Sequence, residues 1–260
     1  MTNPDRPRTF SLLGREWDLL DQVFAPIYSP STGVAVDFLG LTGPNAQTSS
    51  SLLEIGCGAG VIAVQAALAG CATVVAADIN QHAVANTQKN AQRHGVADRV
   101  TVVQSDLFSE LDEGARFDRI FWSSNYVLAP EDYEYRSIHE CAYVDAGYRA
   151  HRRYLSEATN HLTGNGSVLL HFCDRGDIAG LRRIAKECGR KLRILRRRTV
   201  LEGQDLVEHM LLEIRPLSSS EGRSERRSRG TGRPVAVDGR RSARRGRAEA
   251  GLEGRRPART

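Results

Sequence analysis

Hydrophobic positions along most of this chain follow two alternating periods, which predicts an α/β fold. Short apolar or β-branched runs are typical of buried strands, and longer stretches with apolar residues at helical spacing indicate helices. The predicted strands are residues 51–55, 73–78, 99–104, 117–121, 167–172, 191–200 and 206–214, and the predicted helices are 61–68, 80–94, 146–161 and 177–188. Strands that alternate with helices favour a mostly parallel sheet with helices on both faces.

The two ends of this pattern indicate hairpins. Only residues 202–205 separate the last two predicted strands, so these strands are expected to pair. The whole pattern predicts a Rossmann-like, seven-stranded, mostly parallel sheet with an antiparallel edge strand. The Thr-Gly-Asn-Gly run at 163–166 is expected to break the chain before the fifth strand. At the N-terminal side, alternation within residues 10–20 predicts a small hairpin.

A glycine-rich turn joins the first predicted strand to the first predicted helix. Gly56, Gly58 and Gly60 occupy this turn, two to six residues after Glu54. Glycines admit positive φ and allow the main chain to approach a ligand closely. The dinucleotide fingerprint G-x-G-x-x-G would need a glycine where Val61 stands, which counts against NAD. Glu54 is an acid suited to a ligand with a cationic amino-acid portion.

Acids end the next two predicted strands. Asp78 lies eighteen positions after Gly60, near the separation of about 20 residues at which a ribose-binding carboxylate is expected. The alternative for Asp78 is an ordinary acid in a turn. Asp106 and Leu107 follow the third strand, where an acid can meet an adenine amino group.

These motifs together resemble the class I S-adenosylmethionine-dependent methyltransferases over residues 20–215. The runs LLEIGCGAG, VVAADIN, VADRVTVVQSDLF and FDRIF are similar to the branch that contains release-factor glutamine methyltransferases and some RNA guanine methyltransferases. Residues 23–32 resemble the segment that folds over the cofactor in that branch, although an ordinary proline-rich loop is the alternative. The resemblance implies S-adenosyl-L-methionine as the cofactor, held by Phe24, Pro26, Ser31, Thr32, Glu54, Gly56, Gly58, Gly60, Asp78, Asp106, Leu107 and Ser123.

The tetrapeptide that contacts the acceptor in that branch is altered here. The family pattern is Asn-Pro-Pro-Tyr or Asn-Pro-Pro-Phe, whose asparagine and prolyl carbonyl hold a planar nitrogen, whereas this chain has Ser123, Ser124, Asn125 and Tyr126. A serine side chain is too short to make the same pair of hydrogen bonds. We therefore expect a different acceptor, a nitrogen or oxygen of a small molecule, with Ser123, Asn125 and Tyr126 as catalytic candidates.

A base is needed if the acceptor is an oxygen or a protonated amine. His171, near the end of a predicted strand, is a further catalytic candidate, although a structural histidine is the alternative. The acidic and aromatic stretch after Tyr126 is either a substrate lining or a solvated loop face. Its candidates are Glu131, Asp132, Tyr133, Glu134, Tyr135, His139, Glu140 and Tyr143.

Charge divides the chain into parts. Residues 218–260 hold 13 arginines against five acids, a net charge of +8, whereas the remainder carries −3. We expect three segments: residues 1–50 as a hairpin and cofactor-covering segment, 51–217 as the methyltransferase domain, and 218–260 as a disordered Arg-rich tail. The tail lacks aromatic residues for base stacking, so nucleic acid is a possible partner only through its charge.

Cysteine usage and hydropathy indicate the compartment. Five cysteines without a C-x-x-C pair suggest neither a zinc site nor a disulfide framework, and we expect no metal. No apolar run is long enough to span a bilayer, so a cytoplasmic protein without a membrane partner is expected. The sequence leaves the oligomeric state open. The alternatives to a small-molecule methyltransferase are a protein glutamine or RNA methyltransferase and a non-catalytic cofactor-binding domain.

Overall fold

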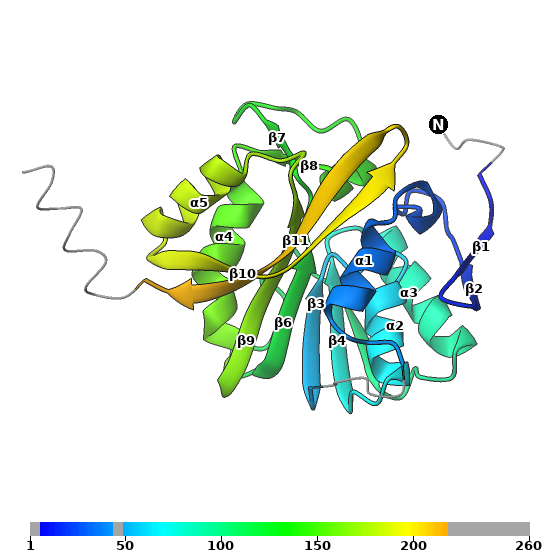
Figure 1. Ribbon diagram of the computed structural model, residues 1–260. Helices are drawn as coiled ribbons and strands as arrows, with labels where there is room; N and C mark the ends of the chain where they lie inside the picture. The colour runs from blue at the N-terminus through cyan, green and yellow to red at the C-terminus, as the bar shows by residue number, and fades with distance from the viewer. Residues whose placement is uncertain (1–5, 44–48, 218–260) are drawn as a thin grey trace, which may run out of the picture. The chain divides into compact units, whose positions relative to one another are not determined.

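The computed structural model describes residues 6–43 and 49–217, and a seven-stranded sheet forms the centre of this part of the chain (Figure 1). The five strands from β9 to β5 in the sheet are parallel, and β11 is antiparallel to both of its neighbours. The strand order is β10 (Arg190–Glu202), β11 (Asp205–Pro216), β9 (Leu162–Cys173), β6 (Phe117–Ser123), β3 (Ser51–Ile55), β4 (Thr73–Asp78) and β5 (Val100–Gln104). The predicted Rossmann-like sheet is confirmed, with the antiparallel strand one place in from the edge because β10 and β11 form a hairpin.

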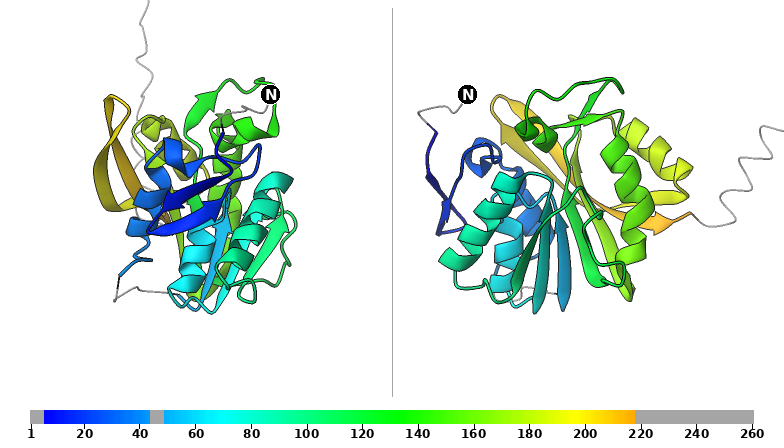
Figure 2. Two further views of the ribbon diagram at one scale, coloured as in Figure 1. Left: turned by 90° about the vertical axis from the view of Figure 1, so that its right-hand side faces the viewer. Right: turned by 180° about the vertical axis from the view of Figure 1, so that it is seen from behind.

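Helices cover both faces of the sheet, as the alternating pattern predicts (Figure 2). One face packs on α1 (Ser31–Phe38), α2 (Val61–Leu68) and α3 (Gln81–Arg93), and the other on α4 (Arg149–Glu157) and α5 (Ile178–Glu187). Each face has its own hydrophobic core. Across the described ranges, every helix is too short or too polar to cross a lipid bilayer.

Short elements complete the part of the chain that the structure describes. The strands β1 (Thr9–Leu12) and β2 (Arg15–Asp18) form the predicted N-terminal hairpin. A second small sheet pairs β7 (Val127–Ala129) with β8 (Val144–Ala146), in parallel. Single turns of 3-10 helix lie at Pro26–Tyr28, Ile138–Ala142 and Ala158–His161. The predicted Arg-rich tail, 218–260, lies outside the described residues.

The first β-α-β unit forms as its sequence dictates. Helix α2 begins directly after Gly60 and is buried over Val61–Ala67, which explains its almost wholly apolar composition. Helix α3 begins at Gln81 and is capped by Asn80, whose side chain accepts a hydrogen bond from the His82 N–H and so satisfies one of the free donors of the first turn. Gly95 ends the helix with a φ of 67°.

The N-terminal hairpin fixes α3 to the glycine turn through two buried asparagines. The side-chain amide of Asn90 donates to the carbonyl oxygens of Asp18 and Ala59, at 3.0 and 2.8 Å. The side chain of Asn86 donates to the Asp18 carbonyl and accepts from the Leu20 N–H. Hairpin, helix and turn are therefore held as one unit.

Two predicted boundaries are wrong. Strand β9 begins at Leu162 and runs through the Thr-Gly-Asn-Gly stretch, because Gly166 allows the strand to approach Phe117 of β6 where a Cβ would lie 2.8 Å from its carbonyl oxygen. The helix predicted to begin at residue 146 begins at Arg149. Gly147 and Tyr148 both have positive φ, 60° and 53°, which separates β8 from α4.

Candidate functional site

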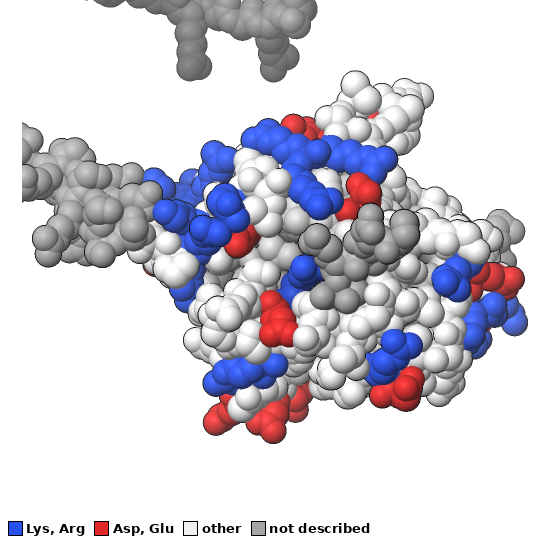
Figure 3. All heavy atoms as spheres, turned by 60° about the horizontal axis from the view of Figure 1, so that its bottom comes forward, with Lys and Arg blue, Asp and Glu red and all other residues white. Residues whose placement is uncertain are grey.

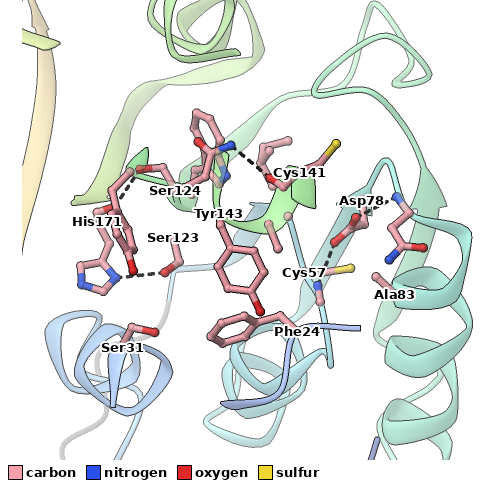
Figure 4. Close-up of a pocket in the computed structure, with 18 of the residues that line it drawn as sticks. Phe24, Ser31, Cys57, Asp78, Ala83, Ser123, Ser124, Cys141, Tyr143 and His171 are labelled. Carbon is pink, nitrogen blue, oxygen red and sulfur yellow. Dashed lines mark hydrogen bonds between the residues drawn. The ribbon is translucent and has the colours of Figure 1, made fainter. Parts of the chain in front are cut away.

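A cavity of about 800 Å³ opens at the carboxyl ends of β3, β4, β6 and β9. In open α/β sheets this edge is where ligands bind, and the volume is that of a small-molecule site. Segments 22–32 and 135–145 complete the lining (Figure 4). Of the residues predicted from the sequence, the lining includes Phe24, Pro26, Ser31, Thr32, Glu54, Gly56, Gly58, Asp78, Asp106, Leu107, Ser123, Asn125, Tyr126 and His171.

The glycine turn forms the floor of this cavity. The N–H groups of Gly56 and Cys57 donate to the Ala77 carbonyl, at 2.8 and 3.1 Å, which ties the turn to β4. Gly56 and Gly58 have φ of 68° and 56°, and a Cβ on Gly56 would lie 3.3 Å from the Nε1 of Trp122. The backbone there is consequently free of side chains that would keep a ligand away.

Gly60 differs from the other two glycines because it does not line the cavity. It has a φ of 79°, and a Cβ at this position would lie 2.8 Å from the Cα of Thr87 on α3. The hydroxyl of Thr87 donates to the Gly58 carbonyl at 3.1 Å. Gly60 therefore serves close packing of α3 against the turn, rather than contact with a ligand.

Asp78 is held rigidly at the end of β4. Its Oδ2 accepts from the Gly58 N–H and its Oδ1 from the Asn80 N–H, both at 2.9 Å (Figure 4). Burial raises the pKa of this carboxyl, and the two backbone hydrogen bonds oppose the shift. Each oxygen keeps a lone pair, so the carboxylate can accept from the two hydroxyls of a ribose.

Glu54 has a buried carboxyl group with one unpaired oxygen among the described residues. It is only 2% exposed, and its Oε2 has no hydrogen-bond partner among the described residues. Burial raises the pKa of Glu54 well above its ordinary range, and the nearby charge of Asp78 adds to the shift. A cationic amino group in the cavity would satisfy this oxygen. Glu54 and Asp78 thus fit the amino group and the ribose of S-adenosylmethionine, and their binding roles stay predictions.

Asp106 and Leu107 also line the cavity. The Asp106 Oδ2 lies 2.6 Å from an Nη1 of Arg153, in an exposed ion pair, and Leu107 is buried with a φ of 56°. Arg153 also lines the cavity and holds the Asp106 carboxylate there, and the adenine role of Asp106 stays a prediction. Within residues 6–43 and 49–217, no three His, Cys, Asp or Glu side chains form a metal-binding cluster.

A chain of hydrogen bonds runs from Ser123 across three adjacent strands. Ser123 Oγ lies 3.0 Å from His171 Nδ1, and His171 Nε2 lies 2.9 Å from His209 Nδ1. His209 Nε2 in turn lies 3.2 Å from Glu202 Oε1. Burial, with a smaller effect of His209, lowers the pKa of His171 from 6.5 to about 3.

Sequence reasoning missed His209 and Glu202. His209 pairs with Cys173 in the antiparallel register of β11 and β9, two residues from His171 on the same face. Glu202 is the last residue of β10, beside the hairpin turn. Alternation along β11 predicts which face of the sheet His209 occupies. The register of β11 with β9, which brings His209 to His171, is known only from the structure.

Asn125 anchors the loop after the altered tetrapeptide. Its side-chain amide donates to the carbonyl oxygens of Cys141 and Val144, at 3.1 and 2.9 Å. Its Oδ1 is buried and has no partner among the described residues. Tyr126 follows on the cavity wall, and its backbone N–H donates to the Tyr143 carbonyl. The tetrapeptide thus includes a buried acceptor atom without a described partner, the Asn125 oxygen.

The acidic and aromatic loop folds partly over the cavity. Its Tyr135, His139 and Tyr143 belong to the lining, and the Tyr143 ring packs edge-on against Phe24 at 5.7 Å. Tyr143 and His139 hydrogen-bond to each other at 3.1 Å. The remaining predicted candidates of this loop, Glu131, Asp132, Tyr133, Glu134 and Glu140, are not part of the lining.

Comparison with known proteins gives sequence relatives for the cofactor half. The family model of the ribosomal protein L11 methyltransferase (PrmA) matches residues 30–122. The ribosomal protein uL3 glutamine methyltransferase of Francisella tularensis is 29% identical over 128 residues, 46% of this chain and 40% of that protein. The release factor glutamine methyltransferase of Streptococcus pneumoniae is 31% identical over 136 residues, 48% of this chain and 47% of that protein. The matches thus span about half or less of these two relatives.

Solved structures share the fold at low sequence identity. A methyltransferase from Pyrococcus furiosus has a TM-score of 0.53 at 18% identity, covering 78% of this chain and 90% of that one. SMU.776, solved in complex with SAH, has a TM-score of 0.56 at 12% identity, covering 82% and 58%. The predicted resemblance is confirmed: the core has the Rossmann-like fold of these structures, and its sequence is similar to that of S-adenosylmethionine-dependent methyltransferases.

The comparisons also correct one prediction. The matching family model and the two relatives above are named for protein acceptors, ribosomal proteins L11 and uL3 and a release factor. The predicted small-molecule acceptor is therefore wrong. That prediction depended on the loss of the Asn-Pro-Pro pattern, but a changed tetrapeptide alters how an acceptor is held without determining its size.

Proposed function

We propose that this chain, built on an S-adenosylmethionine-dependent methyltransferase domain, methylates a side-chain nitrogen of a protein, with a glutamine amide as the favoured acceptor. The observation that carries the proposal is the Asn125 Oδ1, a buried oxygen without a partner among the described residues, in the tetrapeptide at the cavity wall. A buried acceptor without a donor is costly, by about 1–3 kcal/mol. An amide N–H entering the cavity would satisfy it. The protein acceptors named for the sequence relatives support the same class.

The chemistry asks for positioning more than for a strong base. When bound, the cofactor supplies a methyl group on a positively charged sulfur. The acceptor nitrogen takes the methyl carbon, the electrons of the carbon–sulfur bond leave with sulfur, and the nitrogen then releases one proton. The residues of the wall hold that nitrogen in line, and hydrogen bonds from its N–H groups increase its electron density. The packed rings of Phe24 and Tyr143 lie along the cavity wall (Figure 4).

The surface beside the cavity supports a protein acceptor. Tyr28 is 69% exposed and Leu201 64%, and both line a shallow depression next to the main cavity. Leu206, across the same hairpin turn, is 73% exposed. Large apolar side chains exposed together at the rim of a site are typical of a surface that receives another protein.

The described surface is less suited to binding nucleic acid than to binding a protein. Figure 3 shows Lys and Arg side chains gathered on one part of a face. Strand β10 contributes exposed arginines, but Arg193, Arg197 and Arg198 form ion pairs with Glu213, Glu208 and Asp37. Acids beside these arginines reduce the net charge available to neutralise phosphates. We therefore favour protein over RNA as the acceptor.

Label transfer tests the proposal. The full chain is incubated with methyl-labelled cofactor and with separated ribosomal proteins, release factors, total RNA and small-molecule extract. We expect label in the protein fractions, and Asn125→Ala should reduce it while leaving cofactor binding within about twofold. Label confined to RNA, or no label in any fraction from a protein that binds the cofactor, would contradict the proposal.

A further inference from the structure

We infer that Glu202, His209 and His171 form a hydrogen-bond relay that holds Ser123 Oγ as an obligate hydrogen-bond acceptor toward the cavity. In this arrangement Ser123 receives one N–H of the methyl acceptor, and the other three are positioning residues. The inference rests on the proposed function only for the identity of the group that donates to Ser123.

The relay crosses neighbouring strands at one end of the sheet. Ser123 pairs with His171 in the parallel register of β6 and β9, and β11 brings His209 to the other side of β9. The three links are 3.0, 2.9 and 3.2 Å long from Ser123 to Glu202. Figure 4 shows the His171 ring pointing at Ser123 on the cavity wall. All four residues line the cavity.

The carboxylate end gives the chain its direction. An ionised carboxylate can only accept hydrogen bonds, so His209 must donate from Nε2 to Glu202. A neutral ring carries one proton, which leaves His209 Nδ1 as an acceptor for the Nε2–H of His171. His171 Nδ1 is then an acceptor, and the Ser123 hydroxyl proton must point to it. Reversing any link would place two donors or two acceptors face to face.

Two further contacts orient Glu202 and occupy both of its oxygens as acceptors. Its Oε2 lies 3.2 Å from Arg175 Nη1, and its Oε1 accepts from the Ser29 hydroxyl at 3.1 Å. Both histidines are nearly fully buried, 3% and 2% exposed. Burial lowers the pKa of each ring, that of His209 despite the opposing effect of Glu202, so neither carries a second proton at neutral pH. The neutral rings are what the ordered chain requires.

The consequence is a wall with two acceptor atoms. The hydroxyl proton of Ser123 is committed to His171, so its lone pairs remain for a donor in the cavity. Asn125 Oδ1 is the second free acceptor in the same tetrapeptide. A primary amide has two N–H donors, which matches two acceptors. The relay thereby replaces the missing asparagine of the family pattern: a short serine becomes a polarised acceptor because three residues behind it fix its proton.

Imidazole nitrogen NMR reads the relay directly, without cofactor or acceptor. In the full chain labelled with ¹⁵N-histidine, we expect both His171 and His209 to be protonated at Nε2 and bare at Nδ1, near pH 7.5. Each ring is assigned from the spectrum of its His→Gln variant. A protonated Nδ1 on either ring would overturn the inference, whatever the enzyme methylates.

Glu202→Gln tests the source of the direction. Its amide can donate to His209 and so allows the reversed order, and we expect the single tautomer of His171 to become a mixture or to switch to Nδ1–H. Glu208→Gln is the matched control, because Glu208 lies on β11 beside His209 but pairs with Arg197. Its spectrum should equal the wild type. A Glu202→Gln spectrum identical to the wild type would refute the role of the carboxylate.

Kinetics separate positioning from folding. For Glu202→Gln we expect kcat/KM for the protein acceptor to fall about tenfold, which corresponds to about 1.4 kcal/mol of lost transition-state stabilisation, with unchanged affinity for the cofactor. For Ser123→Ala, kcat/KM should fall at least as far. Adding Glu202→Gln to the Ser123→Ala variant should lower kcat/KM little further. Full additivity of the two changes would contradict a shared pathway.

Discussion

Acidification should destabilise this protein in part through the buried His171. His171 has an ordinary pKa of 6.5 in the unfolded chain and about 3 in the folded protein, because burial and the neighbouring His209 disfavour its charged form. Its neutral form therefore contributes stability that is fully present above pH 6.5. That contribution is lost as pH falls from 6.5 toward 3, because the unfolded chain takes up a proton that the folded protein excludes.

The magnitude follows from these two pKa values. The loss approaches about 1.4 kcal/mol per pH unit below pH 6, and between pH 7.5 and pH 4.5 it is on the order of 3 kcal/mol. This is a large share of a typical domain stability of about 5–15 kcal/mol. Unfolding in urea, followed by circular dichroism at pH steps across this range, gives the free energy of unfolding at each pH.

The variant His171→Gln isolates the effect. Glutamine keeps polar atoms beside Ser123 and His209 but does not titrate. Its free energy of unfolding should fall less than that of the wild type over the same pH range, by a difference on the order of 3 kcal/mol. Ser123→Ala is the matched control, because it retains the buried ring and should follow the wild-type slope. Parallel curves for wild type and His171→Gln would refute the reasoning.

Three further predictions concern the cofactor side. Asp78→Ala should weaken cofactor binding about 100-fold by calorimetry, since two hydrogen bonds to a charged group contribute about 3 kcal/mol; retained affinity would remove Asp78 from the site. Glu54→Gln should cost about tenfold in cofactor affinity by losing the charge that faces a cationic group. Gly60→Ala should lower the free energy of unfolding, measured in urea, by roughly 2–5 kcal/mol, because left-handed strain and overpacking against Thr87 add. The control Gly95→Ala has open space at its Cβ, so it should lose only the strain of about 1–2 kcal/mol. Equal losses in the two glycine variants would contradict this account.

The cofactor half of the site was predictable because the sequence patterns that indicate it are local. The glycine turn, the acid at the end of the next strand and the N-cap at Asn80 are each set by a few neighbouring residues, and all lie where the sequence placed them. The start of the helix after Gly147 and Tyr148 was misjudged because these two successive left-handed residues interrupt a stretch with helical spacing. Local periodicity cannot reveal that interruption.

The acceptor half depends on contacts between distant segments. Ser123 meets His171 across 48 positions, and His171 meets His209 across 38. Only the strand order and the register of β9 with β11 bring them together. The sequence indicated that the asparagine of the family pattern was gone. It could not indicate that three residues behind Ser123 supply a substitute.

The site of methylation on the acceptor protein tests the central claim most directly. The full chain is incubated with methyl-labelled cofactor and the ribosomal protein and release factor fractions, and the labelled proteins are digested and sequenced by tandem mass spectrometry. We predict one added methyl group on a glutamine side-chain amide, reduced in parallel by Asn125→Ala and Ser123→Ala. Label on a carboxylate or hydroxyl oxygen of the protein, or on no protein at all, would contradict the account.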